Sequence, residues 1–186
     1  MVLLTGAHGT CADYAESIQN TGFSISKTGG RGGKGVYFWA YIDPELAAYA
    51  KDLAVSWCMF VKSKLGYRVS NDDCVVIFAE LNVINVFLDL EQQETKERLI
   101  LFANSVYRRV KKESRKNGRA VSATYDLFVE MMEEELGREI DVVHLRVSPP
   151  SLDSYKPMLP IQITGSPSCY IARNLEVISI QRIEGA

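Results

Sequence analysis

Three short motifs near the start of the chain carry residue types that can hold a nucleotide. His8-Gly9-Thr10 follows an apolar run, a glycine-rich stretch covers residues 29–35, and Gly35-Val36-Tyr37-Phe38 overlaps its end. Gly9 has no Cβ, so a ligand can approach its backbone N–H and C=O closely. His8 can donate a hydrogen bond to a ribose hydroxyl, and Tyr37 offers a flat aromatic face. Together these groups offer backbone and side-chain hydrogen bonds and an aromatic face to a small ligand.

The glycine-rich stretch contains two cations, Arg31 and Lys34. Exposed backbone amides and nearby cations suit a diphosphate. The stretch is not a Walker loop, because Val36 or Tyr37 stands where that motif needs Ser or Thr. A strand rather than a helix is predicted after it, so it is not the glycine fingerprint of a dinucleotide-binding fold either. A flexible loop without a ligand is the alternative interpretation of such a glycine run.

The order of these motifs resembles the ADP-ribosyltransferase superfamily, in the branch of diphtheria toxin and the poly(ADP-ribose) polymerases. That branch has His-Gly-Thr, then a helix ending in Ile-x-x-x-Gly-Phe, then Gly-Lys-Gly-(Ile/Val)-Tyr-Phe. Here Ile18 to Phe23 and Gly33 to Phe38 occupy the last two places. The likeness covers Ala7 to Tyr49 and returns at Ser168 to Asn174. It implies an α+β fold in which two small facing β-sheets form an NAD cleft with flanking helices.

The resemblance also assigns roles within that cleft. It implies that NAD is a co-substrate and that the nicotinamide lies between Tyr37 and Tyr49, whose spacing is one residue longer than in the family. The residues it implies for NAD binding are His8, Gly9, Thr10, Arg31, Lys34, Tyr37 and Tyr49.

The catalytic positions implied by the resemblance are His8, Tyr37 and Cys169. The family normally has a glutamate on its last active-site strand, and Cys169 stands at or next to that place. A neutral thiol is a weak acceptor, and a thiolate needs a depressed pKa. Cys169 is alternatively a small buried strand residue. Gln162 and Glu176 are the polar residues nearby in the sequence that could substitute for the glutamate.

The implied chemistry is cleavage of the nicotinamide–ribose bond through an oxocarbenium-like transition state, as in glycoside hydrolysis. We expect transfer of one ADP-ribose to a macromolecular acceptor, either protein or nucleic acid, by a toxin-like or defence protein. An antitoxin or other neutralising protein is a further expected partner. One alternative, which Cys169 favours, is a relative that binds NAD, ADP-ribose or a partner protein without transfer. Another is the RNA 2′-phosphotransferase of the same fold, but the chain has no arginine and histidine cluster near His8.

Composition narrows the class of protein. The chain has 186 residues, 47% of them hydrophobic and 24% charged, which predicts one globular domain over residues 1–186. The net charge of −2 argues against a strongly basic nucleic-acid binder. No apolar run is long enough for a membrane span, so no membrane partner is expected. The widely separated Cys11, Cys58, Cys74 and Cys169 predict reduced thiols in a cytoplasmic setting rather than a disulfide framework or a zinc site.

Patterns of apolar residues, glycines and capping residues predict the elements that position these groups. Asp13 is predicted to cap a helix that stops at Gly22 in the left-handed conformation, and Asp43-Pro44 to begin another. Asn117-Gly118 is predicted to end a third. Strands at both ends with helices between them indicate an α+β fold. We predict strands at 2–7, 36–39, 74–81, 83–88, 141–147, 161–164, 170–172 and 176–183, and helices at 13–20, 44–64, 92–116 and 122–136.

Two groups of residues are open to more than one interpretation. Phe38, Trp39 and His144 are expected to be core or strand-edge residues. The helix over 92–116 ends in a basic stripe, which a solvated helix C-terminus explains because cations there suit the helix dipole. Contact with nucleic acid or an acidic partner is the alternative for the stripe, whose members are Arg108, Arg109, Lys111, Lys112, Arg115 and Lys116.

Overall fold

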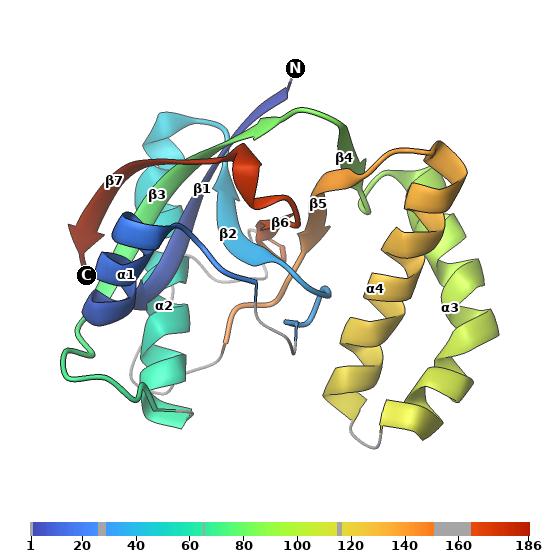
Figure 1. Cartoon of the computed structure of the whole chain (residues 1–186), viewed down its shortest axis with the longest axis horizontal. Helices are drawn as coiled ribbons and strands as arrows, with labels where there is room; N and C mark the ends of the chain where they lie inside the picture. Colours follow the sequence, from blue (N-terminus) through green and yellow to red (C-terminus); the bar gives the residue numbers. More distant parts are fainter. Residues whose placement is uncertain (1, 26–28, 65, 115–116, 151–164) are drawn as a thin grey trace.

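In the part of the chain that the structure describes, runs of Val, Ile and aromatic residues form strands and the stretches between them form four α-helices, so the α+β class is confirmed (Figure 1). The computed structural model describes residues 2–25, 29–64, 66–114, 117–150 and 165–186. The strands are β1 (Val2–Cys11), β2 (Val36–Tyr41), β3 (Cys74–Val83), β4 (Val86–Asp89), β5 (Ile140–Arg146), β6 (Ser168–Ala172) and β7 (Ile178–Gly185). The helices are α1 (Ala12–Thr21), α2 (Ala47–Lys64), α3 (Gln93–Ser114) and α4 (Asn117–Leu136), with short 3₁₀ turns at Pro44–Leu46 and Leu175–Val177.

The strands of the described residues belong to one hydrogen-bonded sheet, in the order β4-β5-β6-β2-β1-β3-β7. All neighbouring strands are antiparallel except β4 and β5. The expectation of two separate facing sheets is therefore wrong for this chain. The reason is β2, whose residues Trp39–Tyr41 pair with β1 while Val36–Trp39 pair with β6, so this strand joins both halves.

The helices lie at opposite ends of this sheet. Figure 1 shows α1 and α2 beside β1 and β3, whereas α3 and α4 form a hairpin beyond β4 and β5. The predicted start of α2 is confirmed in substance: the Asp43 side chain accepts from Glu45 N–H at 2.9 Å, and Pro44 begins the 3₁₀ turn that leads into the helix. The fold thus separates a strand-and-helix half from a two-helix half.

Two helix boundaries and one cap conformation differ from the predictions. Asp13 does not cap α1; its carboxylate accepts instead from Ser70 N–H at 3.0 Å and Asn71 N–H at 3.1 Å. Gly22 is the C-cap of α1, as predicted, and has a positive φ of 80°, but its ψ of 174° lies outside the left-handed helical region. Asn117 begins α4 instead of ending α3, because Asn and Gly suit helix starts as well as helix ends. The predicted strand over 161–164 lies outside the described residues, as do Arg115 and Lys116 of the stripe.

Core residues cover both faces of the sheet. Phe38 is fully buried and Trp39 is 8% exposed, as expected of strand residues. His144 lies on β5, where its Nδ1 is 2.7 Å from an Asp89 carboxylate oxygen. The face beneath α2 is built from Ala7, Trp39, Ala50, Leu53, Ala54, Val76, Phe78 and Cys169. The region beside the hairpin is built from Leu88, Leu90, Phe128, Val129, Met132, Ile140, Val143, Leu145 and Ile171.

The cysteines do not all remain reduced thiols, which corrects the prediction from their spacing. Cys58 of α2 and Cys74 of β3 form a disulfide, whereas Cys11 and Cys169 are buried free thiols. The spacing of Cys58 and Cys74 in the sequence did not predict this disulfide, because the packing of α2 on the sheet brings the two residues together. The cytoplasmic setting stays a prediction. Within the described part of the chain, every helix falls short of the length and apolar character that a membrane span requires.

Candidate functional site

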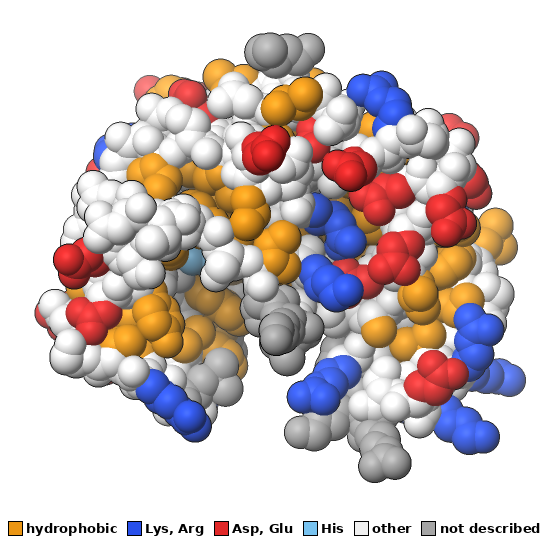
Figure 2. Space-filling view, in the orientation of Figure 1, with side chains coloured by type: hydrophobic (Ala, Val, Ile, Leu, Met, Phe, Trp, Pro, Cys, Tyr) orange, Lys and Arg blue, Asp and Glu red, His pale blue; other side chains and the backbone are white. Residues whose placement is uncertain are grey.

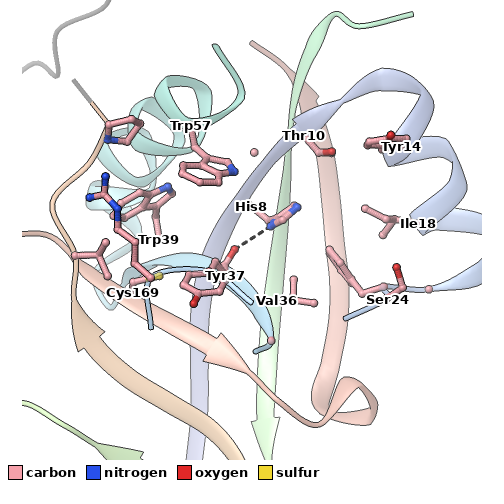
Figure 3. Close-up of a pocket in the computed structure, with 18 of the residues that line it drawn as sticks. His8, Thr10, Tyr14, Ile18, Ser24, Val36, Tyr37, Trp39, Trp57 and Cys169 are labelled. Carbon is pink, nitrogen blue, oxygen red and sulfur yellow. Dashed lines mark hydrogen bonds between the residues drawn. The ribbon is translucent and has the colours of Figure 1, made fainter. Parts of the chain in front are cut away.

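A pocket of about 620 Å³ opens where β1 and β2 separate. Its lining comes from the end of β1, one face of α1, the glycine-rich loop, β2, Trp57 of α2, the segment after β5 and Cys169 of β6. Figure 3 shows His8 in the middle, with Trp39, Trp57 and Cys169 on one side and Tyr14 and Ile18 on the other. The pocket thus brings together residues from both ends of the sequence.

The separation of two strands creates this pocket. β1 pairs with β2 only over Thr5–Ala7, and beyond that point β2 pairs with β6. His8 spans the opening, because its Nδ1 lies 2.8 Å from the carbonyl oxygen of Tyr37 (Figure 3). The His8 side chain therefore bridges β1 and β2 just beyond the last backbone pair between them. The space between the two strands is open to a ligand.

The hydrogen bond of His8 decides which nitrogen faces a ligand. A carbonyl oxygen can only accept, so Nδ1 carries the proton and Nε2 of the neutral ring is an acceptor. Desolvation lowers the pKa of His8, with the bond to Tyr37 opposing it, which favours the neutral ring. The ring packs 5.4 Å from Phe23 and 5.7 Å from Phe38, between centroids. Neutral His8 would therefore accept from a ribose hydroxyl, the reverse of the expected direction.

Tyr37 presents its ring to the pocket and uses its hydroxyl to hold the glycine-rich loop. The hydroxyl accepts from Gly32 N–H at 2.9 Å and donates to the Gly33 carbonyl at 2.7 Å. Burial raises the pKa of Tyr37, so the phenol stays protonated. A Cβ at Gly30 would lie 2.6 Å from the Tyr37 ring, which explains why the loop passes the ring with a glycine. The aromatic face and the loop are therefore one unit.

The glycine-rich loop uses its amides within the protein, contrary to the expectation that they wait for a diphosphate. Gly30 N–H donates to Gly33 O at 2.9 Å, and Gly33 N–H donates back at 3.2 Å. Lys34 N–H donates to an Asp126 carboxylate oxygen at 2.8 Å. The side chain of Arg31 is exposed and the residue lines the pocket, whereas Lys34 lies outside the lining. Arg31 is thus the cation that the loop brings to the pocket.

Gly9 and Thr10 both line the pocket, but Gly9 is required first by packing. A Cβ on Gly9 would overlap the backbone carbonyl of Ala54 in α2. The absent side chain therefore lets the helix approach the strand, and this approach also brings Trp57 to the pocket. Thr10 is 5% exposed. The backbone of Gly9 remains at the pocket wall, where it was expected to meet a carboxamide.

The second aromatic wall is not the expected one. Tyr49 packs against the core beneath α2 and is not part of the pocket lining. Trp57, 39% exposed, and Trp39 supply aromatic rings there instead (Figure 3). Helical phase could have identified Trp57, because it follows Leu53 by one turn on the face of α2 that approaches the sheet.

The sequence of α1 also contains a helical pattern that indicates a wall of the pocket. The positions of α1 that line the pocket recur at helical spacing on one face, and they are Tyr14, Ser17, Ile18 and Thr21. Phe23, just after the helix, completes this wall and contacts His8. The 3.6-residue period therefore indicates this wall of the pocket, of which the family motif contains only Ile18, Gly22 and Phe23.

Cys169 lies in the pocket wall and is a neutral thiol. It stands opposite Trp39 of β2 and Leu145 of β5 in the sheet, and it is 2% exposed. Burial raises the pKa of Cys169 to about 12, so a thiolate is not available at neutral pH. Glu176 is not part of the lining, and Gln162 lies outside the described residues. Among the described lining residues, none has a carboxylate.

The pocket lining therefore contains five of the residues expected to bind NAD, His8, Gly9, Thr10, Arg31 and Tyr37, together with the expected catalytic position Cys169, and it leaves out Lys34 and Tyr49. One further ion pair supports the site from outside: Arg173 Nη1 lies 2.9 Å from Asp126, which also holds the loop. Comparisons with protein-family models, with curated proteins and with solved structures found no match to this chain.

Proposed function

We propose that the pocket binds NAD and that the protein transfers a single ADP-ribose from NAD to a macromolecular acceptor. The observation that carries this proposal is the placement of His8, Tyr37 and Cys169 on the adjacent strands β1, β2 and β6, around one pocket. These are the positions that the resemblance to the ADP-ribosyltransferases makes catalytic. Residues separated by more than a hundred positions in the sequence thus line the same cavity.

The chemistry of the lining supports a nicotinamide nucleotide. Tyr37, Trp39 and Trp57 offer aromatic faces for the nicotinamide ring. Arg31 supplies a cation for the diphosphate, and His8 supplies an acceptor for a ribose hydroxyl. The volume of about 620 Å³ lies within the range of small-molecule pockets. Such a mainly apolar lining with a few placed polar groups is the usual form of a cofactor site.

The neutral Cys169 sets the expected rate of this chemistry. In the proposed reaction positive charge develops on the ribose as nicotinamide leaves, and a carboxylate would stabilise that charge. A buried thiol supplies no charge and little acceptor strength. We therefore expect slow nicotinamide release from the unaltered chain. The same observation favours a second function, in which the protein binds NAD or ADP-ribose without transferring it.

Binding is tested first, by calorimetry with NAD. Tyr37→Ala should weaken NAD binding by about fivefold or more, because a lost aromatic contact is worth about 1 kcal/mol. Tyr49→Ala is the matched control: it removes an equal side chain that does not line the pocket, so NAD affinity should not change. Folding of both variants is checked by circular dichroism. A folded wild-type protein that fails to bind millimolar NAD would rule out the nucleotide site.

Transfer is tested by following nicotinamide release with chromatography. Cys169→Glu should raise the rate at least about tenfold, which corresponds to roughly 1.4 kcal/mol of barrier, whereas Cys169→Ala should leave NAD binding nearly unchanged. NAD binding without nicotinamide release in every variant would select the binding protein over the transferase. Fast release that survives Cys169→Ala would place the essential polar group elsewhere, and Gln162 would be examined next.

A further inference from the structure

The free end of the α3/α4 hairpin carries a concentration of positive charge. We call this the basic tip and define it by five exposed residues: Arg108, Arg109, Lys111, Lys112 and Arg119. The first four belong to the end of α3 and the last to the start of α4. Figure 2 shows Lys and Arg side chains, with an acidic side chain among them, at the lower end of the hairpin, while most of its Asp and Glu side chains lie toward the upper end. The charge of the hairpin therefore changes from mainly acidic at one end to mainly basic at the other.

The cations of the basic tip form no ion pair with any residue that the structure describes. The ion pairs of the hairpin lie toward its other end, where Lys96 pairs with Glu91 at 3.0 Å and Arg98 pairs with Glu135. Like charges three or four residues apart on a helix destabilise it, as at Arg108 and Lys112. An anionic ligand would relieve this repulsion.

Helix stability alone does not account for the basic tip. Cations at the end of α3 suit the helix dipole, which is the ordinary explanation for that stripe. Arg119 stands in the first turn of α4, where the dipole disfavours a cation, and this turn contains no acidic residue. The positive charge therefore continues across the hairpin turn into a position that a purely structural role would not select. This continuation is the observation that the sequence pattern of α3 alone does not reveal.

The basic tip is connected to the rim of the pocket. Ser122 lies one turn after Arg119 in α4, and its Oγ is 2.5 Å from the place of a Cβ on Gly29. Gly29 begins the glycine-rich loop whose next residues, Gly30 and Arg31, line the pocket. Contact between α4 and the glycine-rich loop thus links the end of the hairpin that carries the basic tip to Arg31 at the opening. A long polyanion lying on the tip would extend along α4 toward the pocket.

We infer that the basic tip binds the sugar-phosphate backbone of a nucleic acid, which is the acceptor in the proposed reaction. This inference rests on the proposed function for the transfer step, but not for binding. A cluster of exposed cations without an ion-pair partner in the described residues is the usual contact for regularly spaced phosphates. In the transfer, the bond from ribose C1′ to the nicotinamide nitrogen breaks and nicotinamide leaves with the electron pair. A nitrogen or oxygen of the nucleic acid bonds to C1′ and releases its proton to water.

Binding is measured without NAD, by fluorescence anisotropy with a short labelled single-stranded DNA of mixed sequence and with its duplex. The unaltered protein is compared with Arg108→Glu/Lys112→Glu and with a control that makes the same change of charge elsewhere, Lys64→Glu/Arg68→Glu. The tip variant should bind at least about tenfold more weakly at about 50 mM salt. The slope of log K against log salt should fall by about 1.4 for the single strand, because two phosphate contacts are lost. Arg119→Glu, a single exposed change, should weaken binding in the same direction.

Three results would overturn the inference: no DNA binding by the folded wild-type protein, equal affinity in the tip variant, or an equal loss in the control. Binding of a labelled poly-glutamate peptide in place of DNA would likewise overturn it, in favour of an acidic protein partner. NAD affinity of the same variants is measured by calorimetry. Loss of DNA binding with NAD binding intact, and the reverse, separate a failure of this inference from a failure of the proposed function.

Discussion

The pocket and the hairpin tip treat polar groups in opposite ways. In the pocket, internal hydrogen bonds hold the polar groups beside the strand opening: His8 Nδ1 bonds to the Tyr37 carbonyl, and the Tyr37 hydroxyl bonds to Gly32 and Gly33. At the basic tip, five exposed cations lie together without a counter-ion in the described residues. Buried polar groups must be satisfied because desolvation is costly, whereas exposed charges are tolerated. The fold therefore dictates the pocket residues and leaves the tip residues free to serve a partner.

Asp126 joins the two regions. It belongs to α4 of the hairpin, yet its carboxylate accepts from Lys34 N–H of the pocket loop at 2.8 Å and from Arg173 at 2.9 Å. The side chains of Arg173 and Asp126 are only 15% and 10% exposed. This buried contact holds the hairpin against the loop, so the comparison can be tested by breaking each region and then the joint between them.

The largest effect is expected from Gly9→Ala at the pocket. The new Cβ would overlap the backbone of Ala54, and backbone cannot move aside as a flexible side chain can. We expect a loss of about 3 kcal/mol or more of unfolding free energy, at or above the usual range for overpacking, measured by urea denaturation. Gly185→Ala is the control, because nothing lies within 4 Å of its Cβ position. Similar stability of the two variants would contradict the close approach of α2 to β1.

The joint should give the next largest effect. Asp126→Ala removes the partner of a buried guanidinium and of the Lys34 amide, so we expect a loss of about 3 kcal/mol. Asp126→Ala/Arg173→Met should be less destabilised than the single variant, since it leaves no unpaired buried charge. Glu135→Ala, which breaks an exposed pair on the same hairpin, should cost less than about 1 kcal/mol. Equal losses from Asp126→Ala and Glu135→Ala in urea denaturation would show that the joint is not buried in solution.

The smallest effect is expected from protonation of His8. Its pKa is lowered in the folded state by desolvation, from an ordinary value of 6.5, so the unfolded chain binds the proton more readily. Stability from the neutral ring is therefore fully present above pH 6.5 and is lost as the pH falls below that value toward the folded-state pKa. The loss is at most about 1.4 kcal/mol per pH unit.

His8→Asn provides the comparison for this pH dependence. The Asn amide can still donate to the Tyr37 carbonyl but does not titrate, and His144 is present in both proteins. The unfolding free energy of wild type, from urea denaturation across the pH range, should fall more steeply than that of the variant below pH 6.5. Parallel curves would mean that the His8 ring is not desolvated in the folded state.

The sequence by itself determined the elements and one side of the pocket. Apolar runs bounded by glycine and capping residues located most strands and the start of α2, because period and capping are local properties. His8, Gly9 and Tyr37 could be found for the same reason, since their motif is short. The helical spacing of Tyr14 and Ile18 in α1 is also a local pattern, and it predicts that both residues belong to one wall of the pocket. Such local patterns can be recognised in the sequence because they do not depend on tertiary contacts.

Only the tertiary structure decided which distant residues meet and which groups are already used. The pocket is lined by Trp57 and not by the expected Tyr49, because the packing of α2 places Tyr49 against the core and Trp57 at the opening. In the tertiary structure the backbone N–H of Lys34 donates to Asp126, and Cys58 forms a disulfide with Cys74. Burial of Cys169 between two strands made it a neutral thiol. Contacts and desolvation depend on residues far apart in the chain, and no local pattern contains that information.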